Sequence, residues 1–194
     1  TSNDASVYNH LGNCYKDQGK LDAAIQCFER ALSLAPNNAE IIFNYGITQL
    51  LTGHFDRGWR YYEARHQLKA HRQNAYQLPQ PFWQGENLTD KTLLILAEQG
   101  LGDTLQFVRF LPQLQQQAQP KQIILESQPE LMSLLQFNYP TITITPRTKI
   151  PQEFDVQTHL MSLPYFLHIN IDNIPEAQGY LNAEPSQIEQ NKIN

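Results

Sequence analysis

The residues best suited to chemistry lie in the segment Glu98–Asp103, which directly follows a short apolar run. Its two glycines would let a ligand or another backbone approach closely, so Gln99, Gly100 and Gly102 are candidate substrate-binding residues. Asp103 has two interpretations, because aspartate commonly caps helices and is also a carboxylate able to face a ligand. From the residues alone, helix capping is the simpler role.

The segment matches neither of the common nucleotide-binding loops. Leu105 stands where a dinucleotide-binding loop has its third glycine, and no lysine follows at the position that a phosphate-binding loop requires. The sequence therefore disfavours a free-standing nucleotide-binding enzyme.

A second candidate group, His159–Pro164, follows another predicted strand. His159 either faces a ligand or has a purely structural role. Ser162 lacks the G-x-S-x-G surroundings of a hydrolase nucleophile, which makes a nucleophilic role improbable. It is a candidate substrate-binding residue. Cys14 and Cys27 fall in predicted helices, where they are expected to be small packing residues. The sequence predicts no metal site and no resident cofactor.

Strands and helices alternate in the second half of the chain. The βαβ order predicts right-handed crossovers and an open, doubly wound parallel sheet. In such a sheet ligands bind beyond the carboxyl ends of the strands, where both candidate groups fall. The predicted strands are Thr92–Ala97, Gln122–Glu126, Thr141–Thr145 and Phe154–Gln157.

The first part of the chain contains a helical repeat. Counted from Ala5, the signature positions of the roughly 34-residue tetratricopeptide repeat are all occupied by the expected residue types. Gly19 supplies the turn between the two helices, and a proline ends the second helix. The signature residues are Tyr8, Leu11, Gly12, Tyr15, Ala24, Phe28, Ala31 and Pro36.

A degenerate second unit begins at Ala39, with helices predicted over 39–52 and 55–72. Gln49 and Arg65 stand where an aromatic and a small residue are usual. Two hairpins rarely bury enough surface alone, so we expect the second to pack against something else. The cations of its last helix form either a solvated face, which is favoured, or an anion site. They are Arg57, Arg60, Arg65, Lys69 and Arg72.

The first helices of the two hairpins carry polar residues that would line the inner face of a repeat array. These groups suit the backbone of an extended peptide, and the alternative is an ordinary solvated surface. The candidate peptide-binding residues are Asn9, Asn13, Lys16, Asn44 and Thr48.

Composition narrows the function classes. The 194 residues are 41% hydrophobic and 17% charged, as in folded globular proteins. Residues 1–88 carry eight Lys and Arg against eight Asp and Glu, and residues 89–194 carry six against eleven, so the formal charge of −5 lies in the second part. That balance of charges opposes nucleic-acid binding.

The longest apolar run is too short to span a membrane. Two cysteines without a visible signal peptide favour a reducing cytoplasmic location.

These patterns together predict an α region followed by an α/β region. Tetratricopeptide hairpins would occupy residues 1–72, an ordered strap residues 73–90, and a Rossmann-like, doubly wound parallel sheet residues 91–194. We expect the strap to be ordered because Phe82 and Trp83 are large apolar residues that a loose linker would not carry.

Most of the chain resembles one family, bacterial glycosyltransferases in which tetratricopeptide arrays precede a GT-B type domain. These enzymes are related in layout to protein O-GlcNAc transferases and heptosyltransferases. The specific match is Glu98–Arg109, and order and spacing agree from about residue 5 to residue 182. Supporting matches are Gly58-Trp59, Tyr62–Arg65, Pro81–Gly85, Phe154-Asp155, Leu160–Pro164, Ile174-Pro175 and Tyr180-Leu181.

The resemblance implies that residues 91–194 are the acceptor-binding half of a GT-B domain, which transfers a sugar from an activated donor to a sugar or protein acceptor. Asp103 matches a carboxylate thought to deprotonate the acceptor hydroxyl, and His159 would orient sugar or phosphate. A nucleotide-sugar donor would bind a further C-terminal lobe, expected only in a longer form. The alternative function is a non-catalytic scaffold whose repeats bind a protein partner.

Overall fold

A computed structural model of the chain describes residues 4–69, 78–98, 100–151, 153–175 and 179–185. The chain divides into two compact units. The helical unit extends to Leu78 and includes His168–Ile174, and the sheet unit comprises Pro79–Leu167 and the residues from Pro175 onward. Within the described ranges, no helix is both long enough and apolar enough to cross a lipid bilayer.

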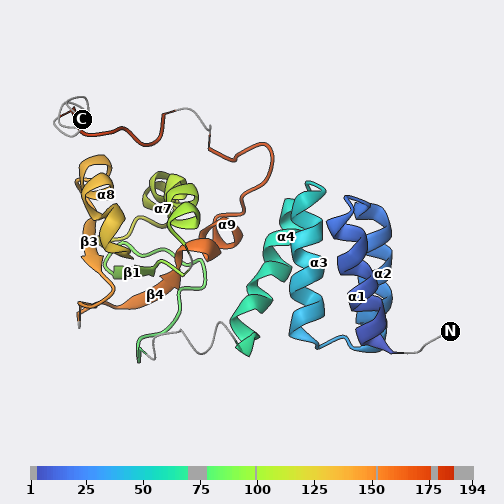
Figure 1. Cartoon of the computed structure of the whole chain (residues 1–194). Helices are drawn as coiled ribbons and strands as arrows, with labels where there is room; N and C mark the ends of the chain where they lie inside the picture. Colours follow the sequence, from blue (N-terminus) through green and yellow to red (C-terminus); the bar gives the residue numbers. More distant parts are fainter. Residues whose placement is uncertain (1–3, 70–77, 99, 152, 176–178, 186–194) are drawn as a thin grey trace. The chain divides into compact units, whose positions relative to one another are not determined.

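The helical unit contains two consecutive helical hairpins (Figure 1). Gly19 and Gly53 adopt positive φ values of 73° and 80° at the two hairpin turns, a conformation that favours glycine. A 3₁₀ helix, η1 (Glu63–Gln67), continues the last helix. The hairpins consist of α1 (Ala5–Asp17) with α2 (Leu21–Leu34), and α3 (Ala39–Leu51) with α4 (Phe55–Tyr62).

Small residues let the helices of each hairpin approach closely. A Cβ atom at Gly12 would lie 2.7 Å from the fully buried ring of Phe28, and one at Gly46 would lie 2.8 Å from the backbone nitrogen of Tyr62. The predicted tetratricopeptide architecture is therefore confirmed for this part of the chain. Its buried core consists of Ala24, Phe28, Ala31, Ile41 and Tyr45.

The expectation of a solvated basic helix face is wrong for one residue. Arg57 and Arg60 are exposed, but Arg65 is buried where a small residue is usual. Its guanidinium pairs with Glu63 and lies 4.8 Å from the centroid of the Tyr62 ring. The α-helix ends at Tyr62 and η1 carries the arginine, while Arg72 lies outside the described residues.

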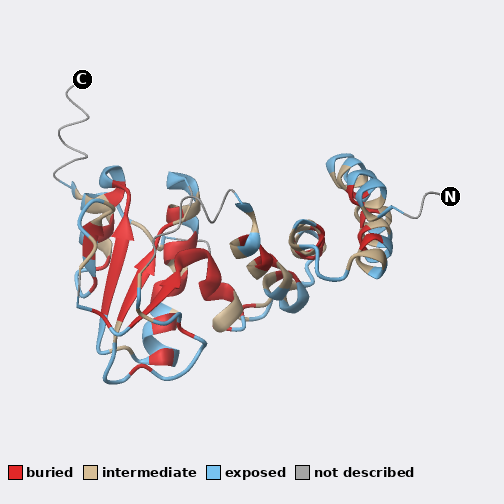
Figure 2. Ribbon diagram, turned by 90° about the horizontal axis from the view of Figure 1, so that it is seen from below, coloured by how far each residue is buried: buried red, intermediate tan, exposed pale blue. Residues whose placement is uncertain are grey.

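In the described part of the sheet unit, four parallel strands form a sheet in the order β3-β2-β1-β4. All four strands coincide with or overlap the predicted stretches, with β3 and β4 beginning two residues later than expected. Figure 2 shows the strands buried along most of their length, as expected for a sheet covered on both faces. The strands are β1 (Thr92–Leu96), β2 (Gln122–Ser127), β3 (Thr143–Pro146) and β4 (Val156–His159).

Short helices connect the strands. Among the described residues, three helical segments lead from β1 to β2, two lead from β2 to β3, and two follow β4. They are α6 (Leu101–Phe107), η2 (Val108–Phe110) and α7 (Leu111–Ala118), then η3 (Pro129–Leu131) and α8 (Met132–Asn138), and finally η4 (Leu160–Ser162) and α9 (Leu163–Phe166).

The described part of the strap packs against the sheet unit. Trp83 is 1% exposed, its backbone N–H donates to the carbonyl of Gln157 at 2.8 Å, and its ring lies 5.2 Å from that of Phe166. Phe82 forms an isolated parallel bridge with Gln157 but remains 47% exposed. One of the two aromatic residues is therefore an anchor, and residues 73–77 lie outside the described ranges.

Candidate functional site

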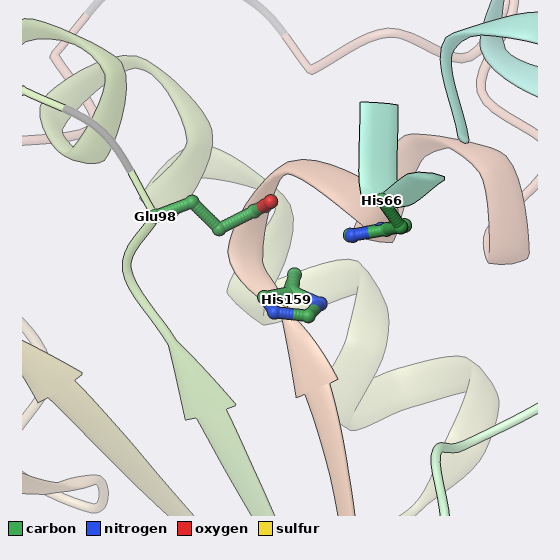
Figure 3. Close-up of side chains that lie close together, drawn as sticks. All are labelled: His66, Glu98 and His159. Carbon is green, nitrogen blue, oxygen red and sulfur yellow. The ribbon is translucent and has the colours of Figure 1, made fainter. Parts of the chain in front are cut away.

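The carboxyl ends of β1 and β4 bring two predicted groups together. The strands are neighbours in the sheet, and their register pairs Leu96 with His159. Glu98 follows β1 by two residues, so its side chain reaches the same edge. Figure 3 shows both side chains at this edge, and a carboxylate oxygen of Glu98 lies within 4.8 Å of an imidazole nitrogen of His159.

Further contacts fix the positions of Glu98 and His159. Oε2 of Glu98 accepts a hydrogen bond from the backbone N–H of Met161 at 3.2 Å, which ties the end of β1 to η4. The His159 ring is largely buried and stacks on Phe82 with ring centroids 5.2 Å apart. A carboxylate beside an imidazole can select its tautomer and orient the ring. These are also ligand types that a zinc ion takes.

Asp103 occupies the third position of α6 rather than its N-cap. The N-cap is Gly100, and Oδ2 of Asp103 accepts a hydrogen bond from the Gly100 N–H at 3.2 Å. This bond satisfies a donor at the start of the helix, as an acidic residue at the third position commonly does. The side chain is partly exposed, and a carboxylate has a second oxygen that can accept a proton.

Neither Gly100 nor Gly102 is required by the backbone conformation or by packing. Gly100 has a φ of −72°, and the positive φ values of the described glycines occur elsewhere. A Cβ atom at Gly100 would have the Asp103 carboxylate as its neighbour, at an ordinary 3.8 Å, and one at Gly102 would meet no heavy atom of the described residues within 4 Å. The space beside these glycines is therefore open to a ligand.

An ion pair that was not predicted from the sequence lies at the same edge of the sheet. Glu126 near the end of β2 has no exposed side-chain surface, and its Oε1 lies 3.0 Å from Nε of Arg147, which follows β3. Arg147 also donates to the carbonyl of Ala97, just beyond β1. Burial raises the pKa of the Glu126 carboxyl, and the charge of Arg147 only partly offsets this effect. A charged residue directly after the apolar run Ile123–Leu125, at the end of the predicted strand, was the available signal.

The structure gives less support to the other two predicted substrate-binding residues, Gln99 and Ser162. Gln99 lies outside the described residues. Ser162 is at the end of η4 and is 2% exposed, so a substrate could reach it only if the covering residues moved.

The five predicted peptide-binding residues form bonds within the helical unit. Asn9 donates to Glu40 at 3.2 Å and accepts from Asn44 at 3.1 Å, which joins α1 to α3. Lys16 donates to Asn13 at 3.0 Å. Thr48 is completely buried and donates to the carbonyl of Asn44 at 2.9 Å. A peptide on this face would therefore have to replace hydrogen bonds that the hairpins already make.

The helical unit also contains an open hollow of about 560 Å³. It lies beside the second hairpin turn and the start of α4, and its lining includes none of the candidate peptide-binding residues. Its lining residues are Gly53, His54, Phe55, Asp56, Arg57, Asn170, Ile171 and Asp172.

Comparison with known proteins identifies the repeats and a relative. The tetratricopeptide repeat family matches residues 5–38 and, with a second pattern, residues 27–60. Protein FlbA of Caulobacter vibrioides is 27% identical over 154 residues, which cover 77% of this chain and 26% of that protein. The chain thus spans about a quarter of the length of this relative. These family matches concern the repeats, and the likeness of the sheet unit to a glycosyltransferase is a proposal.

Proposed function

We propose that this chain is the acceptor-binding half of a GT-B type glycosyltransferase and that its tetratricopeptide hairpins bind a protein. A parallel sheet with a glycine-containing loop at its carboxyl edge supports the first part. The repeat matches support the second part, because stacked helical hairpins present extended surfaces for protein partners.

The observation that carries the proposal is the open space beside Gly100 and Gly102. Within a helix, alanine is more stable than glycine by about 1 kcal/mol, so a glycine that the fold does not need has a cost. Gly102 lies in α6, without a positive φ and without a close neighbour among the described residues. A ligand that approaches the backbone closely is a physical reason for a glycine at this position.

Asp103 supplies the base in this proposal. Oδ2 is held by the Gly100 N–H, which fixes the carboxylate next to the open space, and Oδ1 can accept the proton of an acceptor hydroxyl. A positioned carboxylate that removes this proton typically accelerates the reaction by about 10²–10⁴-fold. The hydroxyl oxygen then forms the new bond to the sugar carbon as the bond from that carbon to the donor phosphate breaks.

Glu98 and His159 act as a positioning pair. The Met161 N–H holds the carboxylate, and stacking on Phe82 holds the imidazole. The imidazole ring is thereby held at the carboxyl edge of the sheet, where it would help to orient the sugar or phosphate of the substrate. Their place at the ends of adjacent strands β1 and β4 suits a ligand that also contacts the glycine loop.

A Gly102→Ala substitution tests the proposal with little risk to folding. The assay uses the longest natural polypeptide that contains these residues, a panel of labelled UDP-, ADP- and CMP-sugars, and Ser/Thr-rich peptides or free glycans as acceptors. We expect kcat/KM to fall by about tenfold or more, because the methyl group occupies ligand space, while the melting temperature is unchanged or higher. Gln116→Ala on the exposed side of α7 is the matched control.

A non-catalytic scaffold is the second candidate, because repeats of this family suit a protein-interaction scaffold. This alternative predicts no transfer from any sugar of the panel and unchanged partner binding in Gly102→Ala. Full transferase activity in Gly102→Ala would contradict the role given to the loop, whereas loss of activity with an unchanged melting temperature would contradict the scaffold.

A further inference from the structure

The two hairpins of the helical unit provide an internal comparison. α1 begins at Ala5 and α3 begins 34 positions later at Ala39, and the turn glycines Gly19 and Gly53 have the same offset. Matched positions on α1 and α3 therefore have equivalent orientations within their hairpins. Where two matched positions differ in burial, the two helices have different neighbours at that position.

Three positions on one face of α3 are buried, and two of them, Ile41 and Tyr45, pack against the first hairpin. Ile41 is 1% exposed, Tyr45 is 5% exposed and Thr48 is completely buried. Ile41 and Tyr45 share a core with α2 residues such as Phe28. The Tyr45 hydroxyl also donates to Glu29 of α2 at 3.1 Å. This face of α3 is therefore the one against which the second helix of the preceding hairpin packs.

The matching face of α1 is uncovered. Val7 corresponds to Ile41 and is 47% exposed, and Leu11 corresponds to Tyr45 and is 41% exposed. Cys14, the counterpart of Thr48, is also exposed. The spacings of four and three residues place all three side chains on one face of the helix. Single exposed apolar residues are ordinary, but here two neighbours are exposed at positions that the second hairpin buries.

We propose that the face formed by Val7, Leu11 and Cys14 receives the second helix of a further tetratricopeptide hairpin, joined to the N-terminal side of α1. That helix packs on α1 as α2 packs on α3. Its chemistry follows from the existing interface: small and aromatic residues at the spacing of Ala24, Phe28 and Ala31. This inference is independent of the proposed transferase activity, since it concerns the helical unit alone.

A fusion protein tests the proposal directly. A second copy of residues 5–38 is placed before Ala5, so that Asn37-Asn38 precede Ala5 as they precede Ala39 in the natural chain. Both cysteines of the copy and Cys27 of the original are changed to serine, which leaves Cys14 of the original as the single thiol. The measurement is the rate at which Cys14 reacts with Ellman's reagent under native conditions.

We expect the reaction to be about tenfold slower or more in the fusion than in the unfused Cys27→Ser chain, because the matched Thr48 is completely buried. Val7→Lys with Leu11→Lys in the original hairpin should restore the faster rate. An unchanged rate in a fusion whose helical content has risen would overturn the proposal. Slow reaction in the unfused chain, accompanied by concentration-dependent dimerisation, would instead assign the face to a second copy.

A second pair of substitutions keeps the proposal testable even if the fusion folds poorly. In the unfused chain, Val7→Glu with Leu11→Glu should leave the melting temperature within about 2 °C, because exposed substitutions are usually within about 0.5 kcal/mol of neutral. Ile41→Glu at the matched buried position should unfold the helical unit. A comparable loss at Val7 and Leu11 would show that their face is already covered in this chain and would overturn the proposal.

Discussion

Nε of Arg147 lies 3.0 Å from Oε1 of Glu126, a carboxylate without exposed surface in β2. Arg147 follows β3, and its guanidinium also donates to the carbonyl of Ala97 beyond β1. Ala97 in turn donates its N–H to Oε2 of Glu126 at 3.1 Å. The carboxyl ends of three strands are thus joined by one ion pair and its hydrogen bonds, next to the segment Glu98–Asp103 that contains Gly100 and Gly102.

Glu126→Gln should change how stability depends on pH. Burial raises the pKa of the Glu126 carboxyl despite Arg147, so the folded state holds this proton more tightly than the unfolded state does. The free energy of unfolding of the natural chain therefore falls as pH rises from about 4.3 through the raised value. Glutamine does not titrate. Urea unfolding between pH 4 and 7 should show that the free energy of unfolding of the variant, minus that of the natural chain, increases as pH rises. A difference that decreases instead would contradict the raised pKa.

Arg147→Gln should be destabilising near neutral pH. Without its guanidinium, the buried Glu126 carboxylate loses its partner. Because the Arg147 side chain is 39% exposed, we expect this to cost about 1–3 kcal/mol, less than in a pair buried on both sides. The double variant Glu126→Gln with Arg147→Gln should recover much of this loss because no buried charge remains. Denaturant unfolding of the two single variants and the double variant measures the coupling. Additive losses would show that the pair acts as two independent residues.

The repeat and the strands were predictable because their signals are local and periodic. The signature positions of the first hairpin specify which residues meet within about 30 residues of chain, and Gly12 does lie against Phe28. Short, apolar runs such as that of β1 identify buried strands for the same reason. Glu98 and His159 meet because parallel strands carry their carboxyl ends to a common edge, which the order of elements predicts.

Other features of the site depend on contacts that no local pattern specifies. Arg147 reaches Ala97 across 50 residues of sequence, and the partner of Asp103 depends on the path of the loop. Arg65 was expected in solvent because cations on a helix surface usually are, but its ion pair with Glu63 and the Tyr62 ring make burial possible. The polarity of Thr48 predicted an exposed ligand group, whereas its hydroxyl bonds to the helix backbone.

Tyr139→Phe should weaken the sheet unit. The buried Tyr139 hydroxyl donates to the carbonyl of Val108 at 3.1 Å, and burial raises the pKa of Tyr139 to about 12. Loss of the hydrogen bond should cost about 1–2 kcal/mol. Because the folded pKa exceeds the unfolded value of about 10, stability should also fall as pH rises from 10 to 12 in the natural chain but less in the variant. Titration by absorbance at high pH should assign the late-ionising phenol to Tyr139.

Gly46→Ala should destabilise the helical unit more than Gly102→Ala destabilises the sheet unit. The new Cβ atom would lie 2.8 Å from the backbone nitrogen of Tyr62, so α3 and α4 would have to separate, at about 1–3 kcal/mol or more. Gly102 provides the matched control, since alanine there has open space and better helix propensity. Thermal unfolding of both variants measures the difference. Equal melting temperatures would mean that the hairpin does not depend on close helix approach at Gly46.

Asp103 can be tested for its two roles with two substitutions. Asp103→Asn keeps an oxygen that can accept the Gly100 N–H bond, so the free energy of unfolding should stay within about 0.5 kcal/mol, but an amide cannot accept the acceptor's proton. Turnover in the longest natural polypeptide should therefore fall by about 10²–10⁴. Asp103→Ala also removes the hydrogen bond to Gly100, and it should lower the free energy of unfolding by a further ~0.5–1 kcal/mol. Full turnover in Asp103→Asn, with stability lost only in Asp103→Ala, would leave Asp103 with the structural role alone.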